Sequence, residues 1–394
     1  MTQEGADLPL VSVSITAYNR ADMVIEAIDS VIAQDYPNFE VIICDDGSTD
    51  GTGDVIWQRY GDRVTYFWQE NQGSVAARNA TLQKARGDYV AFMSDDDLWL
   101  PDKLSRQVVA MEANPDAGLC YGRCLVVTAE GEHTDRTHEL SDQGQSGDVF
   151  GLFLDKNVIM EPVTMVRRSV LDEVGHFDPE LRGGKDTDLF LRIALRYPAV
   201  YIPEPLMLVR VHAGRRTKNA TGRERALRAR AKTMAKLLGM LPRKRERFRP
   251  RLARLLVGAR LEIIGLTLEG LSWEELGQEL VALHEEPGAA GAEQQLAQGT
   301  ASLVRRWGRA HPEQAGRLRG ESLRELAEAL SSPPQAPAGR EARLSAAMGL
   351  NSLRMGKMGE GIGWLARGAA RNLPATIGQC GWALGQVLTR RARE

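Results

Sequence analysis

The sequence lacks several features that would assign it to common classes of protein. It has four cysteines in 394 residues, at positions 44, 120, 124 and 380, and they form no paired framework. A disulfide scaffold is therefore not expected, and no second Cys or His pair accompanies Cys120 and Cys124 to complete a zinc site. Residues 1–7 contain no basic stretch followed by an apolar one, so we expect no secretory signal and folding in the cytosol.

Aspartate is absent from the second half of the chain. Residues 213–394 contain 32 Lys and Arg, 17 Glu and no Asp, whereas residues 1–212 contain 18 Lys and Arg against 35 Asp and Glu. The net charge of −2 hides this asymmetry. Because single cores stop growing near roughly 250 to 300 residues, the change in composition predicts two separately built units.

Short apolar runs alternate with amphipathic helical patterns through the first hundred residues. We predict strands at 10–15, 39–44, 64–67 and 88–93, with helices at 24–32, 55–60 and 74–85 between them. Such alternation predicts an α/β domain with a doubly wound, Rossmann-like, mainly parallel sheet and right-handed crossovers. Beyond residue 220, Leu, Ala and Arg at helical spacing predict helical hairpins. The predicted domains are residues 1–214, α/β, and residues 215–394, basic and mostly helical.

Polar residues follow the predicted strands, at the sheet edge where ligands bind in such folds. Asp95-Asp96-Asp97 follows an apolar strand, and Asp45-Asp46 follows another. Three adjacent carboxylates either form a solvated acidic turn or attract Mg²⁺ or Mn²⁺, which takes few protein oxygens together with phosphate oxygens. Asp46 either belongs to a turn or accepts a hydrogen bond from a nucleotide base.

Several motifs follow one another along the first half of the chain. They are Val13-Ser14-Ile15-Thr16-Ala17-Tyr18-Asn19-Arg20, Ser30-Val31-Ile32-Ala33-Gln34, Asp45-Asp46-Gly47-Ser48-Thr49-Asp50, Asn71-Gln72-Gly73, Ala77-Arg78-Asn79, and Asp95-Asp96-Asp97 with Trp99 and Pro101. In this order they resemble the motifs of glycosyltransferase family 2, whose members have the GT-A fold. The resemblance covers roughly residues 8–212, about half of the chain.

The resemblance implies roles for residues that would bind the donor. Thr16 and Arg20 would contact the nucleotide, Asp46 would contact the base, and Arg78 would lie at the nucleotide side of the donor. Asp95 would touch the ribose or the sugar.

The resemblance also implies a metal site that holds Mn²⁺ or Mg²⁺ against the diphosphate. Ser94 stands where the family often has its first motif aspartate, so we expect coordination to rest on Asp96. We also predict a strand at 206–211, and His212 directly after it is either a second metal ligand or an ordinary loop residue.

Asp186 is the general base that the resemblance implies. The family usually has Glu-Asp at this point, whereas this sequence has Lys185-Asp186 after Gly183 and Gly184. A cation close to Asp186 would lower its pKa. A helix-capping role for Asp186 is the alternative, and Asp188 is a second candidate base.

The function implied by the resemblance is an inverting, metal-dependent hexosyltransferase. It would move a sugar from a nucleotide diphosphate sugar, with UDP sugars favoured, to a glycan, glycolipid or lipid-linked acceptor in bacterial surface polysaccharide or glycolipid synthesis. A nucleotidyltransferase is one alternative, but residues 16–20 do not form the Gly-rich phosphate loop expected after its first strand. A non-catalytic scaffold is another, and it would bind nucleotide sugar without turnover.

Basic residues concentrate at the start of the second half. Residues 215–260 contain 17 Lys and Arg against two Glu. They form solvated helix faces or attract anionic lipid headgroups, and nucleic acid is not expected because no binding motif accompanies them. The uncharged segment 373–388 is too short to span a bilayer; it either lies on a membrane or packs within the helical unit. We expect a cytoplasmic protein, with a peripheral position on the cytoplasmic membrane face as a further hypothesis.

Overall fold

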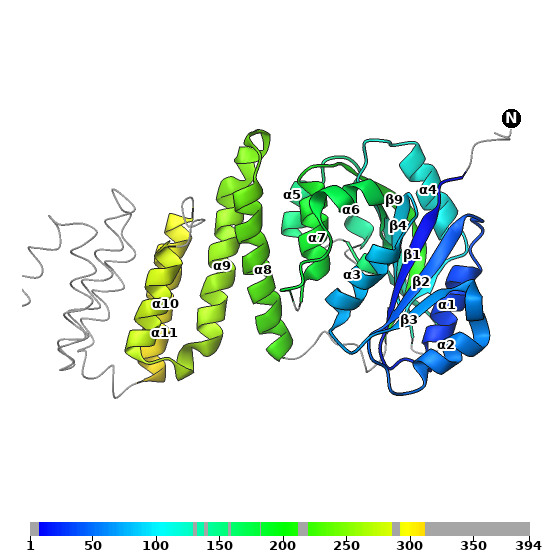
Figure 1. The fold of residues 1–394 in the computed structure, drawn as a ribbon. Helices are drawn as coiled ribbons and strands as arrows, with labels where there is room; N and C mark the ends of the chain where they lie inside the picture. Colours follow the sequence, from blue (N-terminus) through cyan, green and yellow to red (C-terminus); the bar gives the residue numbers. More distant parts are fainter. Residues whose placement is uncertain are drawn as a thin grey trace, which may run out of the picture. The chain divides into compact units, whose positions relative to one another are not determined.

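The computed structural model describes residues 8–128, 132–137, 141–156, 159–181, 183–211, 220–285 and 292–311. The chain divides into two compact units between Gly222 and Arg223. The first contains a mixed sheet with helices, and the second is helical in its described part (Figure 1). The predicted boundary after residue 214 falls within residues 212–219, outside the described residues, and stays a prediction.

A sheet of nine strands, counted within the described residues, forms the centre of the first unit. The strand order is β3-β2-β1-β4-β8-β6-β9-β5, and β7 pairs with β6. The strands are β1 (Val11–Ala17), β2 (Phe39–Asp45), β3 (Thr65–Trp68), β4 (Tyr89–Ser94), β5 (Leu98–Trp99), β6 (Leu119–Val127), β7 (His133–Thr137), β8 (Met165–Arg167) and β9 (Ala199–Arg210).

The first four strands in this order are parallel, as the alternating pattern predicts. Ile15 of β1 lies between Ile43 of β2 and Met93 of β4, and all three side chains are fully buried. Helices cover both faces of the sheet, so β1 and β4 are buried on both faces, and β1 places the small side chains of Ser12 and Ser14 there. Beyond β4 the sheet is mixed, because β8 runs antiparallel to both β4 and β6 whereas β6 and β9 are parallel.

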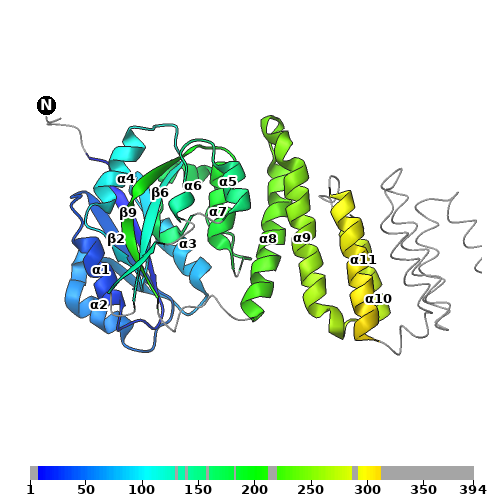
Figure 2. The ribbon, with the colours of Figure 1, turned by 180° about the vertical axis from the view of Figure 1, so that it is seen from behind.

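Helices lie on both sides of this sheet. In both views α1 and α2 lie on one side, and α3, α5 and α7 lie on the other (Figures 1 and 2). The helices of this unit are α1 (Val24–Ile32), α2 (Thr52–Tyr60), α3 (Ser74–Lys84), α4 (Lys103–Glu112), α5 (Phe150–Asp155), α6 (Arg168–Val174) and α7 (Lys185–Ala194), with 3-10 turns η1 (Gly61–Arg63), η2 (Ser141–Gln143) and η3 (Glu161–Val163).

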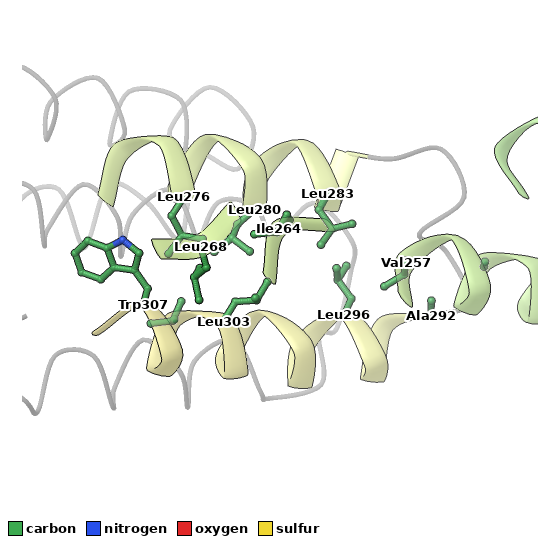
Figure 3. Packing of buried hydrophobic residues seen from close by; sticks show 12 residues of the cluster. Val257, Ile264, Leu268, Leu276, Leu280, Leu283, Ala292, Leu296, Leu303 and Trp307 are labelled. Atoms are coloured by element: carbon green, nitrogen blue, oxygen red, sulfur yellow. The ribbon is translucent and has the colours of Figure 1, made fainter. Parts of the chain in front are cut away.

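The second unit confirms the predicted helical hairpins over its described residues. Its elements are α8 (Ala220–Met240), η4 (Arg243–Phe248), α9 (Arg249–Thr267), η5 (Leu268–Gly270), α10 (Trp273–Glu285) and α11 (Glu293–Ala310). Leu276, Leu280 and Leu283 of α10 face Leu303 and Trp307 of α11 in one buried cluster (Figure 3). This apolar stripe at helical spacing is what holds the unit together.

Membrane association of this unit is not tested by its described part. No helix within the described residues combines the length and the apolar character needed to cross a membrane. The segment 373–388 lies outside the described residues.

Candidate functional site

A cleft of about 730 Å³ opens at the carboxyl ends of β1, β2 and β4. The loops after these strands line one part of it, and η3 with the start of α7 lines another. Seven of the predicted site residues line the cleft: Thr16, Arg20, Asp46, Arg78, Asp95, Asp96 and Asp186. The eighth, His212, lies outside the described residues, so its metal role stays a prediction.

Asp46 connects the end of β2 to the loop before α3. Its Oδ1 accepts hydrogen bonds from Gln69 Nε2 at 2.7 Å and the Gln72 amide at 3.0 Å, and its Oδ2 accepts one from the Gly73 amide at 2.9 Å. A carboxylate oxygen has two acceptor sites, so Oδ2 retains one for a ligand. The base contact predicted for Asp46 is therefore compatible with its role in fixing this loop.

The loop after β4 holds the three consecutive aspartates in different environments. Asp95 Oδ2 accepts a hydrogen bond from the Tyr18 amide at 3.1 Å, and buried Asp97 accepts one from the Arg210 amide at 3.1 Å. Burial, together with the neighbouring charge of Asp96, raises the pKa of Asp95 to about 6. Two of the aspartates thus bind neighbouring strand ends, and Asp96 lies between them at the cleft.

Arg78 lines the cleft, but its guanidinium also binds the protein beneath it. It donates to the carbonyl oxygens of Ser14 at 2.6 Å and Met93 at 3.1 Å, which belong to β1 and β4. Its Nε lies 2.5 Å from Glu161 Oε1 in an ion pair, and the whole residue is 2% exposed. These contacts show that Arg78 joins β1 and β4, the two strands that end at the cleft. The contact of Arg78 with the nucleotide stays a prediction.

Asp186 occupies the second position of α7, on the part of the cleft formed by that helix. The residue before the helix is Gly184 in a left-handed conformation with φ 59°, and the helix start shows no side-chain cap. Asp186 is therefore not the N-cap residue of α7, although it lies in the first turn of that helix. Asp186 Oδ1 instead accepts a hydrogen bond from the adjacent Thr187 amide at 2.8 Å.

The other acidic residue of this turn does not reach the cleft lining. Asp188 is fully buried, and its Oδ2 pairs with Arg192 Nε at 2.8 Å. Arg192 in turn donates to the carbonyl oxygens of Val174, Gly175 and His176 at the end of α6. Asp188 thus joins two helices, which leaves Asp186 as the acidic side chain of α7 that faces the site.

The charge environment of Asp186 differs from the prediction made from Lys185 alone. Burial raises the pKa of Asp186, and the negative charge of Glu161 raises it further. Lys185 lowers it, as predicted, but these two effects outweigh Lys185. A carboxylate with a raised pKa accepts a proton more readily, which is the property that a general base needs.

Glu161 is the site residue that the sequence patterns did not identify. It lies in η3, 8% exposed, between Arg78 and Lys185. Burial alone would raise the pKa of Glu161, but the charges of Arg78 and Lys185 outweigh burial and hold that pKa below its ordinary value. A signal was present, since Glu161 is the single charged residue in the otherwise uncharged segment 158–166. Charges in such segments are buried and paired when the segment enters a core.

The donor atoms fit a divalent ion that is shared with a diphosphate. Among the described residues, no group of three or more His, Cys, Asp or Glu side chains could hold a metal by itself. Mg²⁺ is commonly held by one or two carboxylates, with waters and substrate phosphates completing its shell. Asp96 offers such a hard oxygen ligand at the cleft, with Asp95 beside it.

The sequence of this chain is similar to those of known glycosyltransferases. A family model described as glycosyl transferase family 2 matches residues 12–175. An uncharacterized glycosyltransferase of Rickettsia typhi is 34% identical over 222 residues, which cover 54% of this chain and 67% of that protein. Escherichia coli WfaP, a UDP-Glc:alpha-D-GlcNAc-diphosphoundecaprenol beta-1,3-glucosyltransferase, is 41% identical over 106 residues, which cover 27% of this chain and 42% of WfaP.

The chain spans only part of the length of these relatives. An uncharacterized glycosyltransferase of Rickettsia felis is 34% identical over 208 residues, yet the match covers 34% of that protein. Among solved structures, S. aureus TarS 1-349 in complex with UDP-GlcNAc has a TM-score of 0.51 and 18% identity, over 89% of this chain and 92% of that one. At that identity the likeness concerns the fold alone.

Proposed function

The chain belongs to glycosyl transferase family 2, and from this premise we propose that it moves a sugar from a nucleotide diphosphate sugar to an acceptor hydroxyl with inversion. We propose UDP sugars as donors and a lipid-linked or glycolipid acceptor of bacterial surface polysaccharide synthesis. The name of WfaP supports both choices, because that relative uses UDP-Glc and a diphosphoundecaprenol-linked sugar. We place the reaction in the cytoplasm, with the basic second unit toward an anionic membrane surface.

One observation carries the proposal: the loops after three neighbouring parallel strands meet Asp186 in a single cleft. Thr16 and Arg20 follow β1, Asp46 follows β2, and Asp95 and Asp96 follow β4. Five polar or charged side chains on one sheet edge suit a nucleotide diphosphate, which presents a base, a ribose and two phosphates. Asp186 of α7 lines the same cleft, and we assign to it the deprotonation of the acceptor hydroxyl.

The reaction consists of a single displacement. Asp186 accepts the proton as the acceptor O–H bond breaks, and the acceptor oxygen forms a bond to the anomeric carbon of the sugar. The bond between that carbon and the diphosphate oxygen breaks at the same time, and its electron pair leaves with the diphosphate. Because attack and departure occur on opposite faces, the configuration at the anomeric carbon inverts.

The departing diphosphate needs positive charge nearby. Asp96, with Asp95 beside it, would hold Mn²⁺ or Mg²⁺, whose chemistry here is to neutralise the diphosphate oxygens. Arg20 lies in the same cleft and stabilises the charge of Asp95. The cleft thus contains two carboxylates, Asp95 and Asp96, that would bind the metal, and one guanidinium, Arg20, that would contact the donor.

The test of this function compares Asp186→Asn with the wild-type chain. Removing a general base lowers the rate roughly 100- to 10,000-fold, so nucleotide release from a panel of UDP and GDP sugars should fall by that factor. Asp172→Asn is the matched control, because Asp172 is an exposed α6 residue outside the cleft lining. Full turnover by Asp186→Asn would refute the assignment of the base.

The same experiment separates both alternatives from the proposed function, and a second assay with a nucleoside triphosphate and a sugar phosphate separates them from each other. A non-catalytic scaffold would bind a nucleotide sugar but release no nucleotide in either variant. A nucleotidyltransferase would consume a nucleoside triphosphate with a sugar phosphate and would leave nucleotide diphosphate sugars unchanged.

A further inference from the structure

The cation beside the proposed base has a buried counterion on a different element. Lys185 Nζ lies 3.2 Å from Glu161 Oε2, and the exposed fractions of the two side chains are 18% and 9%. The other carboxylate oxygen of Glu161 pairs with Arg78 at 2.5 Å. Glu161 therefore bridges a cation of α3 and a cation of α7, directly beneath the cleft.

This bridge is held in place from several sides. Trp99 Nε1 donates to the Pro162 carbonyl at 3.1 Å, and Gln107 Nε2 donates to the Val163 carbonyl at 2.9 Å, so the two residues that follow Glu161 are both anchored. Lys185 Nζ also lies 5.3 Å from the centre of the Phe177 ring. A surface ion pair between mobile side chains would show no such support.

The structure shows the ammonium of Lys185 directed to Glu161 and not to its chain neighbour. Within the described part of the chain, no ion pair joins Lys185 to Asp186. A Lys185–Asp186 pair would stabilise the ionised carboxylate and would weaken it as a base. Since Lys185 directly precedes the proposed base, its ammonium needs another partner if Asp186 is to keep its strength as a base.

Resting on the proposed function, we propose that Glu161 is a positioning residue that binds the Lys185 ammonium and so preserves Asp186 as a general base. This role of Glu161 depends on Lys185, the residue directly before the proposed base. As a consequence, the acceptor hydroxyl would contact an Asp186 carboxylate that forms no ion pair with Lys185.

Other charged groups also share the cleft with Asp186. Besides Glu161 and Lys185, they are Arg20, Asp46, Arg78 and the three aspartates at 95–97. Asp188, one residue beyond Thr187, is paired with Arg192. Of these groups, Glu161 raises the pKa of Asp186 and Lys185 lowers it, after the larger effect of burial.

Two substitutions should move the titration of Asp186 in opposite directions. Glu161→Gln removes a negative charge and releases Lys185, so Asp186 should titrate at lower pH. Lys185→Met removes the cation and leaves Glu161 paired with Arg78, so Asp186 should titrate at higher pH. The double variant should titrate between the two single variants.

The measurement is ¹³C NMR of the full chain labelled at the aspartate side-chain carboxyl, with the Asp186 signal assigned by its loss in Asp186→Asn. The acid limb of the pH dependence of kcat/KM for nucleotide release should shift in the same directions. Glu173→Gln is the control, because Glu173 is half exposed and pairs with Arg196 away from the cleft.

Unshifted titration in both single variants, or shifts of the same sign, would overturn the proposal. If Glu161→Gln fails to fold, Glu161→Asp takes its place, because the shorter side chain keeps a carboxylate for Arg78 but withdraws it from Lys185, and Asp186 should again titrate at lower pH. The NMR titration needs no substrate. A wild-type chain without turnover but with opposite shifts would therefore refute the proposed function while leaving the role of Glu161 in place.

Discussion

Lys103 is a buried amine whose replacement gives a quantitative test of the packing beneath the site. It is fully buried on α4, its Nζ donates to Gln107 Oε1 at 2.7 Å, and it lies 3.7 Å from the centre of the Trp99 ring. Gln107 and Trp99 also bind the backbone of η3, which carries Glu161. Burial lowers the pKa of Lys103 to about 7.

The sign of the effect follows from proton binding in the two states. Between pH 7 and the ordinary lysine value, the unfolded chain binds a proton at Lys103 that the folded chain does not, so the free energy of unfolding rises with pH. Each unit of pH in this range adds about 1.4 kcal/mol. From pH 7 to 10 the wild type should therefore gain up to about 4 kcal/mol relative to Lys103→Met, and below pH 7 the two curves should run parallel.

Urea unfolding of the full chain at several pH values, followed by tryptophan fluorescence, measures this difference. Trp99 lies against Lys103, so its emission reports on the relevant region. Lys103→Met is the matched reference, because the methionine side chain has a similar volume to lysine and no group that ionises. Parallel stability curves for the two proteins from pH 7 to 10 would refute the reasoning, because they would show that Lys103 keeps its proton in the folded state.

Two further predictions concern the donor loop and the helical unit. Gly47 has φ +84°, and a Cβ there would lie 2.8 Å from the Asn71 amide, so Gly47→Ala should weaken UDP binding about tenfold by calorimetry, or roughly 1.4 kcal/mol. Gly51 has φ +88°, but a Cβ there would have no atom within 4 Å, so Gly51→Ala should bind UDP as the wild type does. Equal UDP affinities of the wild type, Gly47→Ala and Gly51→Ala would contradict the assignment of the loop after β2 to the donor site. Trp307→Ala should lower the free energy of unfolding of the helical unit by about 3 to 5 kcal/mol, because Trp307 is fully buried and its Nε1 donates to the Leu271 carbonyl at 2.8 Å. Thermal unfolding measures this loss. An unchanged transition would contradict the role of Trp307 in the buried cluster.

The first half of the sheet could be predicted because its signals are local. β1 alternates apolar residues with Ser and Thr, β2 and β4 are mainly apolar runs, and polar residues follow each of them, so the strand ends that line the cleft could be identified one by one. The motif residues then converge because parallel strands end at one edge. Thr16, Asp46 and Asp96 follow directly from this rule.

The mixed half depends on contacts between distant segments. The strand β6 contains Gly122 and Arg123, which weaken a strand pattern, and it was not predicted. In the structure a Cβ at Gly122 would lie 2.5 Å from Leu206 Cδ1 of β9, so the glycine permits the close approach of those strands. Periodicity along one segment contains no information about such a partner.

Glu161 was missed for the same reason. Its role depends on Arg78 and Lys185, which come from two other elements, and neither spacing nor composition joins the three. The sequence predicted correctly that Lys185 acts on Asp186, but the compensating charge became visible only from the packing of η3 against α7.

Isothermal titration of the full chain with UDP and with GDP, each with and without Mn²⁺, tests the central claim most directly. The structure predicts metal-dependent binding of UDP that is lost in Asp96→Ala and retained in Asp62→Ala, since Asp62 is an exposed residue of η1 outside the cleft lining. Binding of neither nucleotide by the wild-type chain, under any metal condition, would contradict the assignment of the cleft as a nucleotide-sugar site.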